Sequence, residues 1–179
     1  MSDMWTDEAT DPRTYGNPVG ELATYVEYLA NYRITLELKC QDLTPEQLAT
    51  RSIPPSTMSL LGLVRHMARV EHHWFERVAQ GVDEPRLFHE RRDLDFDGAL
   101  GTQECVDDAF ALWRAHVRRA EEWVVSLDES DLGRELPMPG AADETVSIRD
   151  LLVHMIEEYA RHCGHADLLR ECVDGRTGQ

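Results

Sequence analysis

The segment that decides the fold lies near the C-terminus, where residues 147–170 read SIRDLLVHMIEEYARHCGHADLLR. Ser147, with Asp150 three residues later, is close to a capping box, and Gly175 is typical of the residue that ends a helix. These signals predict one helix of roughly 27 residues, about 40 Å long. A helix of that length spans a whole small domain.

The predicted inward face of this helix is interrupted by two polar residues. Spacings of three and four residues give the stripe Leu151, Met155, Glu158, His162, Ala166 and Leu169. A buried carboxylate beside a buried imidazole costs several kcal/mol unless both groups are satisfied. Because side chains four residues apart on a helix are neighbours, Glu158 and His162 can bind one divalent cation, or they can form an ordinary salt bridge. The helix alone leaves both interpretations open.

Composition excludes several classes of function. The chain has 179 residues, which suits a single domain with a sizeable core. Its formal net charge is −16, from 34 acidic and 18 basic residues, and such a surface repels phosphate backbones and anionic membranes. No apolar run is long enough for a membrane span, and the acidic N-terminus lacks the apolar core of a signal peptide. We therefore expect a cytoplasmic protein that binds neither nucleic acid nor membranes.

The cysteines do not indicate a disulfide framework or a catalytic dyad. Cys40, Cys105, Cys163 and Cys172 show no paired spacing, which favours reduced thiols. Cys163 follows His162 directly, but consecutive residues on a helix point about 100° apart. A Cys–His dyad is therefore not expected here.

The rest of the chain predicts three further helices. Residues 1–18 contain two prolines and Gly16 and predict a flexible arm. The expected elements are a first helix at 19–41, a short turn of helix at 43–48, a second helix at 58–80 and a third at 102–127. Ser56 or Thr57 is expected to cap the second helix, with Gly81 ending it. Residues 176–179 form a C-terminal tail.

Two connections are long. Residues 83–101 are polar and aperiodic, which is typical of a crossover or of a lid over a site. Residues 128–144 contain Gly133, Pro137, Pro139 and Gly140, and we expect a loop there. The prediction is an all-α four-helix bundle with a long crossover between the second and third helices, forming one domain over residues 19–175.

Two segments together resemble a known family. These are SLLGLVRHM at residues 59–67 and VHMIEEYARHCGHADLLR at residues 153–170, and they are similar to motifs of the DinB-like superfamily of four-helix-bundle metalloproteins. The resemblance covers residues 19–175 and is strongest to the branch related to mycothiol-dependent maleylpyruvate isomerase and the mycothiol and bacillithiol S-transferases. It implies a bundle with a crossover between the second and third helices, and a divalent metal held by three side chains at one end.

The resemblance implies a ligand set. His66 stands at the position of the family's first ligand. Where many members have His-x-x-x-His on the fourth helix, this chain has Glu158 and His162, as the isomerase branch does. The implied metal is Zn²⁺, with Ni²⁺ or Fe²⁺ as alternatives. His165 stands where many relatives have Gln, so its role as a fourth ligand, as support for a ligand or as a substrate contact stays open.

Other polar residues near these positions have alternative interpretations. His154 lies four residues before Glu158 and is a second candidate partner for it, although it points away from the inward stripe. Glu71 and Arg161 either support the ligands, contact substrate or form ordinary ion pairs. A solvated contact is expected for His72 with Glu76, and surface positions are expected for His73, His89 and His116.

The resemblance also implies a reaction. A bound metal would hold a low-molecular-weight thiol, in this branch mycothiol, as the thiolate that attacks a small electrophile. The isomerase carries an additional C-terminal domain that contributes to its active site, so its reaction is not expected here. The alternatives are a metal-dependent hydrolase of the same fold and a non-catalytic metal-binding helical module. The expected partners are the thiol and the electrophile, and a homodimer is left open.

Overall fold

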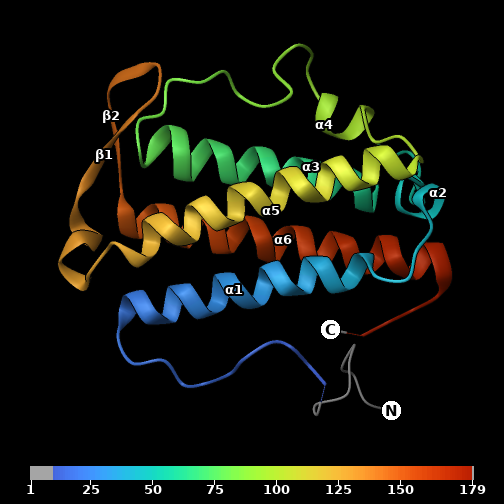
Figure 1. The fold of residues 1–179 in the computed structure, drawn as a ribbon, viewed down its shortest axis with the longest axis horizontal. Helices are drawn as coiled ribbons and strands as arrows, with labels where there is room; N and C mark the ends of the chain where they lie inside the picture. The colour runs from blue at the N-terminus through green and yellow to red at the C-terminus, as the bar shows by residue number, and fades with distance from the viewer. Residues whose placement is uncertain (1–9, 179) are drawn as a thin grey trace.

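The four predicted helices pack side by side in the computed structural model, which describes residues 10–178 (Figure 1). The bundle consists of α1 (Glu21–Cys40), α3 (Leu60–Glu71) with its π-helical continuation η1 (His72–Val78), α5 (Gln103–Val125) and α6 (Ile148–Asp174). The short helices α2 (Pro45–Leu48) and α4 (Leu94–Asp97) lie in the connections. The all-α bundle with a long crossover between its second and third helices is confirmed.

The helix ends follow local hydrogen bonding. At α6, the Ser147 side chain accepts the backbone N–H of Asp150, and Gly175 ends the helix with φ of 78°. At α3, Ser59 is the cap, because its side chain accepts the N–H of Gly62. The expected cap at Ser56 or Thr57 is therefore wrong. The Ser56 hydroxyl instead accepts the N–H of Met58 and holds that segment in a turn.

The connection between α5 and α6 is more regular than the sequence indicates. It contains the short helix η2 (Glu129–Gly133) and an antiparallel hairpin of β1 (Glu135–Met138) and β2 (Ala141–Ser147), in which Leu136 pairs with Val146. The prediction of a loop over 128–144 is wrong. Pro137 is tolerated because each strand of a two-stranded sheet has one unpaired edge. Gly140, with φ of 84°, makes the turn.

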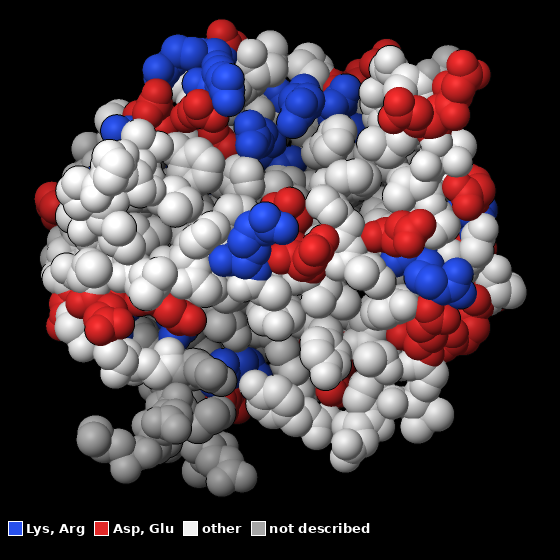
Figure 2. Space-filling view, turned by 180° about the vertical axis from the view of Figure 1, so that it is seen from behind, with Lys and Arg blue, Asp and Glu red and all other residues white. Residues whose placement is uncertain are grey.

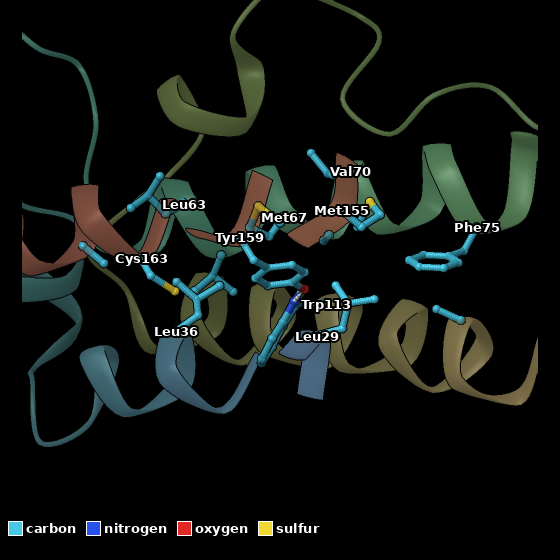
Figure 3. Packing of buried hydrophobic residues seen from close by; sticks show 14 of the residues in the cluster. Leu29, Leu36, Leu63, Met67, Val70, Phe75, Trp113, Met155, Tyr159 and Cys163 are labelled. Carbon is cyan, nitrogen blue, oxygen red and sulfur yellow. Dashed lines mark hydrogen bonds between the residues drawn. The ribbon is translucent and has the colours of Figure 1, made fainter. Parts of the chain in front are cut away.

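The core is built from the inner faces of all four helices. On α6 the predicted stripe is buried except at Glu158, which lies at its edge, and Tyr159 takes the central place instead. The residues around it come from every long helix (Figure 3) and include Leu29, Leu36, Leu63, Met67, Phe75, Trp113 and Met155.

A buried polar network crosses this core and joins the four helices. Arg33 on α1 donates from Nε and Nη2 to the two carboxylate oxygens of Glu71 on α3, both at 2.9 Å. The Tyr159 hydroxyl on α6 donates to Glu71 at 2.5 Å and accepts the Trp113 ring N–H from α5 at 2.9 Å (Figure 3). Burial raises the pKa of Tyr159 well above its ordinary value, so the hydroxyl keeps the proton that it donates.

The first described residues of the chain lie against α1. Of the arm expected over residues 1–18, residues 1–9 lie outside the described residues. The following segment runs beside α1, where the Thr14 N–H donates to Asn31 and Arg13 is buried next to Asp11.

Within the described chain, none of the helices combines the length and the apolar composition that crossing a membrane requires.

The network predicts a specific sensitivity to substitution. Glu71→Ala should lower the free energy of unfolding by about 3–5 kcal/mol, because the buried Arg33 guanidinium loses both hydrogen bonds to Glu71 and keeps only the longer contact of 3.6 Å with the exposed Glu121. Glu122→Ala, on the exposed face of α5, should change it by less than about 0.5 kcal/mol. Urea denaturation of both variants measures the difference. Equal effects would mean that the ion pair does not hold the helices together.

Candidate metal centre

Three predicted residues come together between α3 and α6. The Nε2 atom of His66 lies 4.0 Å from Oε2 of Glu158, and Nε2 of His162 lies 3.4 Å from the same oxygen. Their ligand atoms all lie within 4.8 Å of one another. His162 is buried, whereas Glu158 and His66 are half-buried. The spacing of four residues on α6 thus places both side chains beside the histidine of α3, as the sequence predicted.

The crossover orients the first of these histidines. Asp95 on α4 is fully buried, and its Oδ2 lies 2.9 Å from Nδ1 of His66 and 3.1 Å from the guanidinium of Arg69. Because a carboxylate only accepts, Nδ1 carries the proton and the Nε2 lone pair of the neutral ring is left for a metal. The Phe96 ring stacks on His66 with centroids 5.1 Å apart.

The sequence of α3 explains why α4 can approach so closely. A Cβ atom added to Gly62 would lie 3.0 Å from the Phe96 ring, so a larger residue there would push α4 away. Arg65 donates from Nε to the Asp95 carbonyl at 2.8 Å and from Nη2 to the Leu94 carbonyl at 3.2 Å. Gly62, Arg65 and Arg69 are three and four residues apart, so they lie on one face of α3. This face contacts the short helix α4.

Electrostatics prepare the centre for a cation. Burial on its own lowers the pKa of His66, but the hydrogen bond with Asp95 and the nearby Glu158 carboxylate outweigh burial and raise the pKa above its ordinary value. The rings of His162 and then of His66 beside it hold the pKa of Glu158 well below its usual range. The Glu158 carboxylate is therefore an anion at neutral pH and directs negative charge at the space that the three side chains share.

Two more histidines surround the three. Nδ1 of His165 lies 3.3 Å from Nδ1 of His162, and burial together with the neighbouring His162 lowers the pKa of His165. A neutral His165 is thus placed behind His162. His154 lies 3.6 Å from the other oxygen of Glu158, with its ring 4.5 Å from that of Trp74.

The donor set fits a divalent transition metal. Two imidazole nitrogens and one carboxylate oxygen form a set used by catalytic zinc sites, which keep a further position open. The carboxylate behind His66 is the partner that metal-bound histidines ordinarily have. The three side chains open into a cavity of about 470 Å³, which gives that position access from outside.

The cavity is lined from α3, η1, the crossover and α6. Beside the three predicted ligands its wall contains Arg69, Val70, His73, Trp74, Arg86, Phe96 and Arg161. Arg161 therefore lines the cavity, and its role there stays a prediction. Glu71 is the ion-pair partner of Arg33 in the core. Arg86 and Phe96 come from the connection over residues 83–101, for which a crossover and a lid over a site were the two expectations.

The π-helical segment η1 overturns several expectations. Its wider turn places Phe75 rather than Trp74 in the core and leaves Trp74 on the cavity wall. His72, Glu76 and His116 are buried, with His116 bonded to Glu76. A solvated His72–Glu76 contact and a surface position for His116 are therefore wrong.

Three further predictions can be compared with the structure. The expected surface position of His89 is confirmed, whereas that of His73 is wrong, because His73 is half-buried in the cavity wall. Cys163 faces a separate cavity of about 760 Å³ beside α1. Burial raises the pKa of the Cys163 thiol to about 12, so the thiol does not act as a nucleophile.

Asp95 is the supporting residue that the sequence did not identify. It lies in DLDFD at residues 93–97, where three acidic residues alternate in an aperiodic segment. Nothing in that spacing selects one of the three. Only the packing of α4 on α3 does so.

Comparisons with known proteins agree with this architecture. A family model described as mycothiol-S-transferase matches residues 24–175. The crystal structure of a conserved protein from Enterococcus faecalis superposes with a TM-score of 0.60 at 19% identity, covering 86% of this chain and 96% of that chain, and at this identity it shows the fold alone. A comparison with curated proteins found no match.

Metal analysis tests the ligand set. The purified protein should bind about one divalent cation per chain. His162→Ala should lose it, because two remaining ligands bind far more weakly, whereas His154→Ala should retain it. Plasma emission spectrometry after dialysis gives the stoichiometry. Full occupancy in His162→Ala together with loss in His154→Ala would move the site toward Trp74.

The pair of His66 and Asp95 predicts a pH dependence in the metal-free protein. The pKa of His66 is higher in the folded protein than in the unfolded chain. The stability that the protonated ring contributes is therefore complete below the unfolded pKa and is lost as pH rises through the folded pKa. Asp95 has a lowered pKa, because His66 and Arg69 outweigh its burial, so its contribution is lost as pH falls through that pKa. Asp95→Asn should therefore destabilise most between pH about 4 and 6.5. Denaturation at pH 5.5 and 8.5 measures this, and a larger loss at pH 8.5 would contradict it.

Proposed function

Because the chain belongs to the mycothiol S-transferase family, a DinB-like family, we propose that it is a metal-dependent thiol S-transferase that joins a low-molecular-weight thiol, mycothiol, to a small electrophile. Family membership supports the thiol S-transferase type of activity. The convergence of His66, Glu158 and His162 beside an open cavity supports the metal dependence.

The chain's own residues would hold the metal and shape its surroundings. His66 and His162 would bind through Nε2 and Glu158 through its carboxylate, with Zn²⁺ the cation that this set suits best. When bound, the cation lowers the pKa of a coordinating thiol and so supplies a thiolate at neutral pH. Asp95 keeps the proton of His66 on Nδ1, which leaves Nε2 directed at the centre.

The proposed reaction needs no nucleophile from the protein. The thiol loses its proton to solvent, and its sulfur forms a new bond to the electrophilic carbon. In a substitution the leaving group departs with the electron pair of its broken bond. In a conjugate addition the displaced pair moves into the acceptor, which then takes a proton from solvent. The half-buried Trp74 and Phe96 rings offer the electrophile an apolar surface beside the ligands.

Activity measurements test the proposal. The metal-loaded protein should accelerate thiol-dependent consumption of a reactive halide, and His162→Ala should lower the rate by more than about a hundredfold, since it removes a ligand. His154→Ala should stay within a few fold of the wild type. Thiol binding should release about one proton, which calorimetry in buffers of different ionisation enthalpy measures.

Two outcomes would overturn the proposal. Metal-dependent ester or amide cleavage without thiol would identify a hydrolase that uses the same ligands. Thiol binding without proton release and without turnover would identify a binding module.

A further inference from the structure

Basic residues surround the cavity of a strongly acidic protein. The formal net charge is −16, yet Arg69, Arg86 and Arg161 all line the space next to the three ligands. They come from three separate elements, which are α3, the crossover and α6. Figure 2 shows basic side chains gathered at the upper edge of the molecule, the edge along which the crossover runs in Figure 1.

Two of these arginines differ from Arg69, which pairs with Asp95. Within residues 10–178, neither Arg86 nor Arg161 makes an ion pair or a side-chain hydrogen bond, and both are exposed. Elsewhere in the same range, several exposed arginines pair with carboxylates, as Arg91 does with Asp97 and Arg114 with Glu37, although Arg118 on α5 does not. In a chain with nearly twice as many acidic as basic residues, unpaired guanidinium groups at a cavity wall indicate an anionic ligand.

The acidic residues of the site do not neutralise these charges. Glu158 faces the two histidine ligands, and Asp95 is occupied by His66 and Arg69. His73 on the cavity wall responds to the positive surroundings, since burial and then the charges of Arg86 and Arg77 lower its pKa to about 4. His73 is therefore neutral at physiological pH, and the field around it comes from the arginines.

The cavity wall also has an apolar part. Val70, Trp74 and Phe96 line the same cavity as the arginines and the three candidate ligands. Trp74 is half-buried, because η1 turns it out of the core. A ligand that fills the space would therefore place an apolar or aromatic body on Trp74, with an anionic group within reach of the two guanidinium groups.

We propose that this cavity selects electrophiles that carry a carboxylate or a comparable anionic group, held by Arg86 and Arg161 while the apolar part lies on Trp74. This inference rests on the proposed thiol transfer for its reacting partner. Both arginines bind the far end of the substrate and not its reacting carbon. They therefore determine specificity and are not catalytic residues.

Turnover of a matched pair of substrates tests the charge preference. The pair is 4-(chloromethyl)benzoate and 4-(chloromethyl)benzamide, which lose the same chloride from the same carbon. Arg86→Gln and Arg161→Gln should each raise KM for the benzoate about five- to tenfold with kcat unchanged, and should leave the benzamide unaffected. Arg118→Gln, which removes an exposed charge from α5, should change neither substrate. Arginine variants that affect both substrates equally would overturn the inference.

A second arm assigns the charge to the electrophile and not to the thiol. The neutral benzamide is held constant, and the thiol is either N-acetylcysteine or its neutral amide. Arginine variants that discriminate between these thiols, but not between the two electrophiles, would place the anionic group on the thiol and would contradict the inference.

Binding without chemistry separates this inference from the proposed function. Calorimetry with the inert pair 4-methylbenzoate and 4-methylbenzamide on the metal-loaded protein needs no thiol and no turnover. The benzoate should bind more tightly, its affinity should fall with added salt, and both arginine variants should weaken it about five- to tenfold. If the protein shows such binding but no transferase activity, the proposed thiol transfer is refuted and the charge selection is not. Equal affinities for the two compounds would refute the charge selection.

Discussion

The buried ion pair between Arg33 and Glu71 is the constraint on which the rest of the structure depends. Through Tyr159 and Trp113 it reaches all four helices, and it sits where water cannot replace a lost partner. Tyr159 directly precedes the turn that carries His162 and directly follows Glu158. Because each residue on a helix turns by about 100°, the hydrogen bond that fixes Tyr159 also fixes the direction of Glu158 and His162, the two proposed ligands on α6. Stability and site geometry therefore share one turn of helix.

The bundle and the crossover contribute different parts of the centre. The long helices provide the three proposed ligands, while the crossover provides the Asp95 carboxylate, the Phe96 ring and the Arg86 charge. Because Gly62 has no side chain, α4 can lie directly against α3, and Arg65 donates hydrogen bonds to backbone carbonyl groups of α4. Changes in this one connection are thus expected to alter the orientation of His66 and the charge of the cavity wall without disturbing the bundle core.

The sequence predicted the elements whose signals are local. The caps and periodicity of α6 predicted its extent, and the two motifs predicted which residues would meet. Properties that depend on tertiary packing were not predictable. The Arg33–Glu71 pair joins residues 38 positions apart. The π-helical turn buries Phe75 and leaves Trp74 on the cavity wall. The hairpin lies in a segment rich in turn residues. Only the packing of α4 on α3 determines which of the three neighbouring aspartates, Asp95, bonds to His66.

A divalent cation held by His66, Glu158 and His162 is the central feature of the proposed chemistry, and anomalous diffraction from crystals of the protein as purified tests it most directly. The predicted result is one anomalous peak per chain, with Nε2 of both histidines and a carboxylate oxygen of Glu158 at about 2.0–2.2 Å. A peak at the buried pair of His72 and His116 instead, or none after soaking with Zn²⁺, would contradict it.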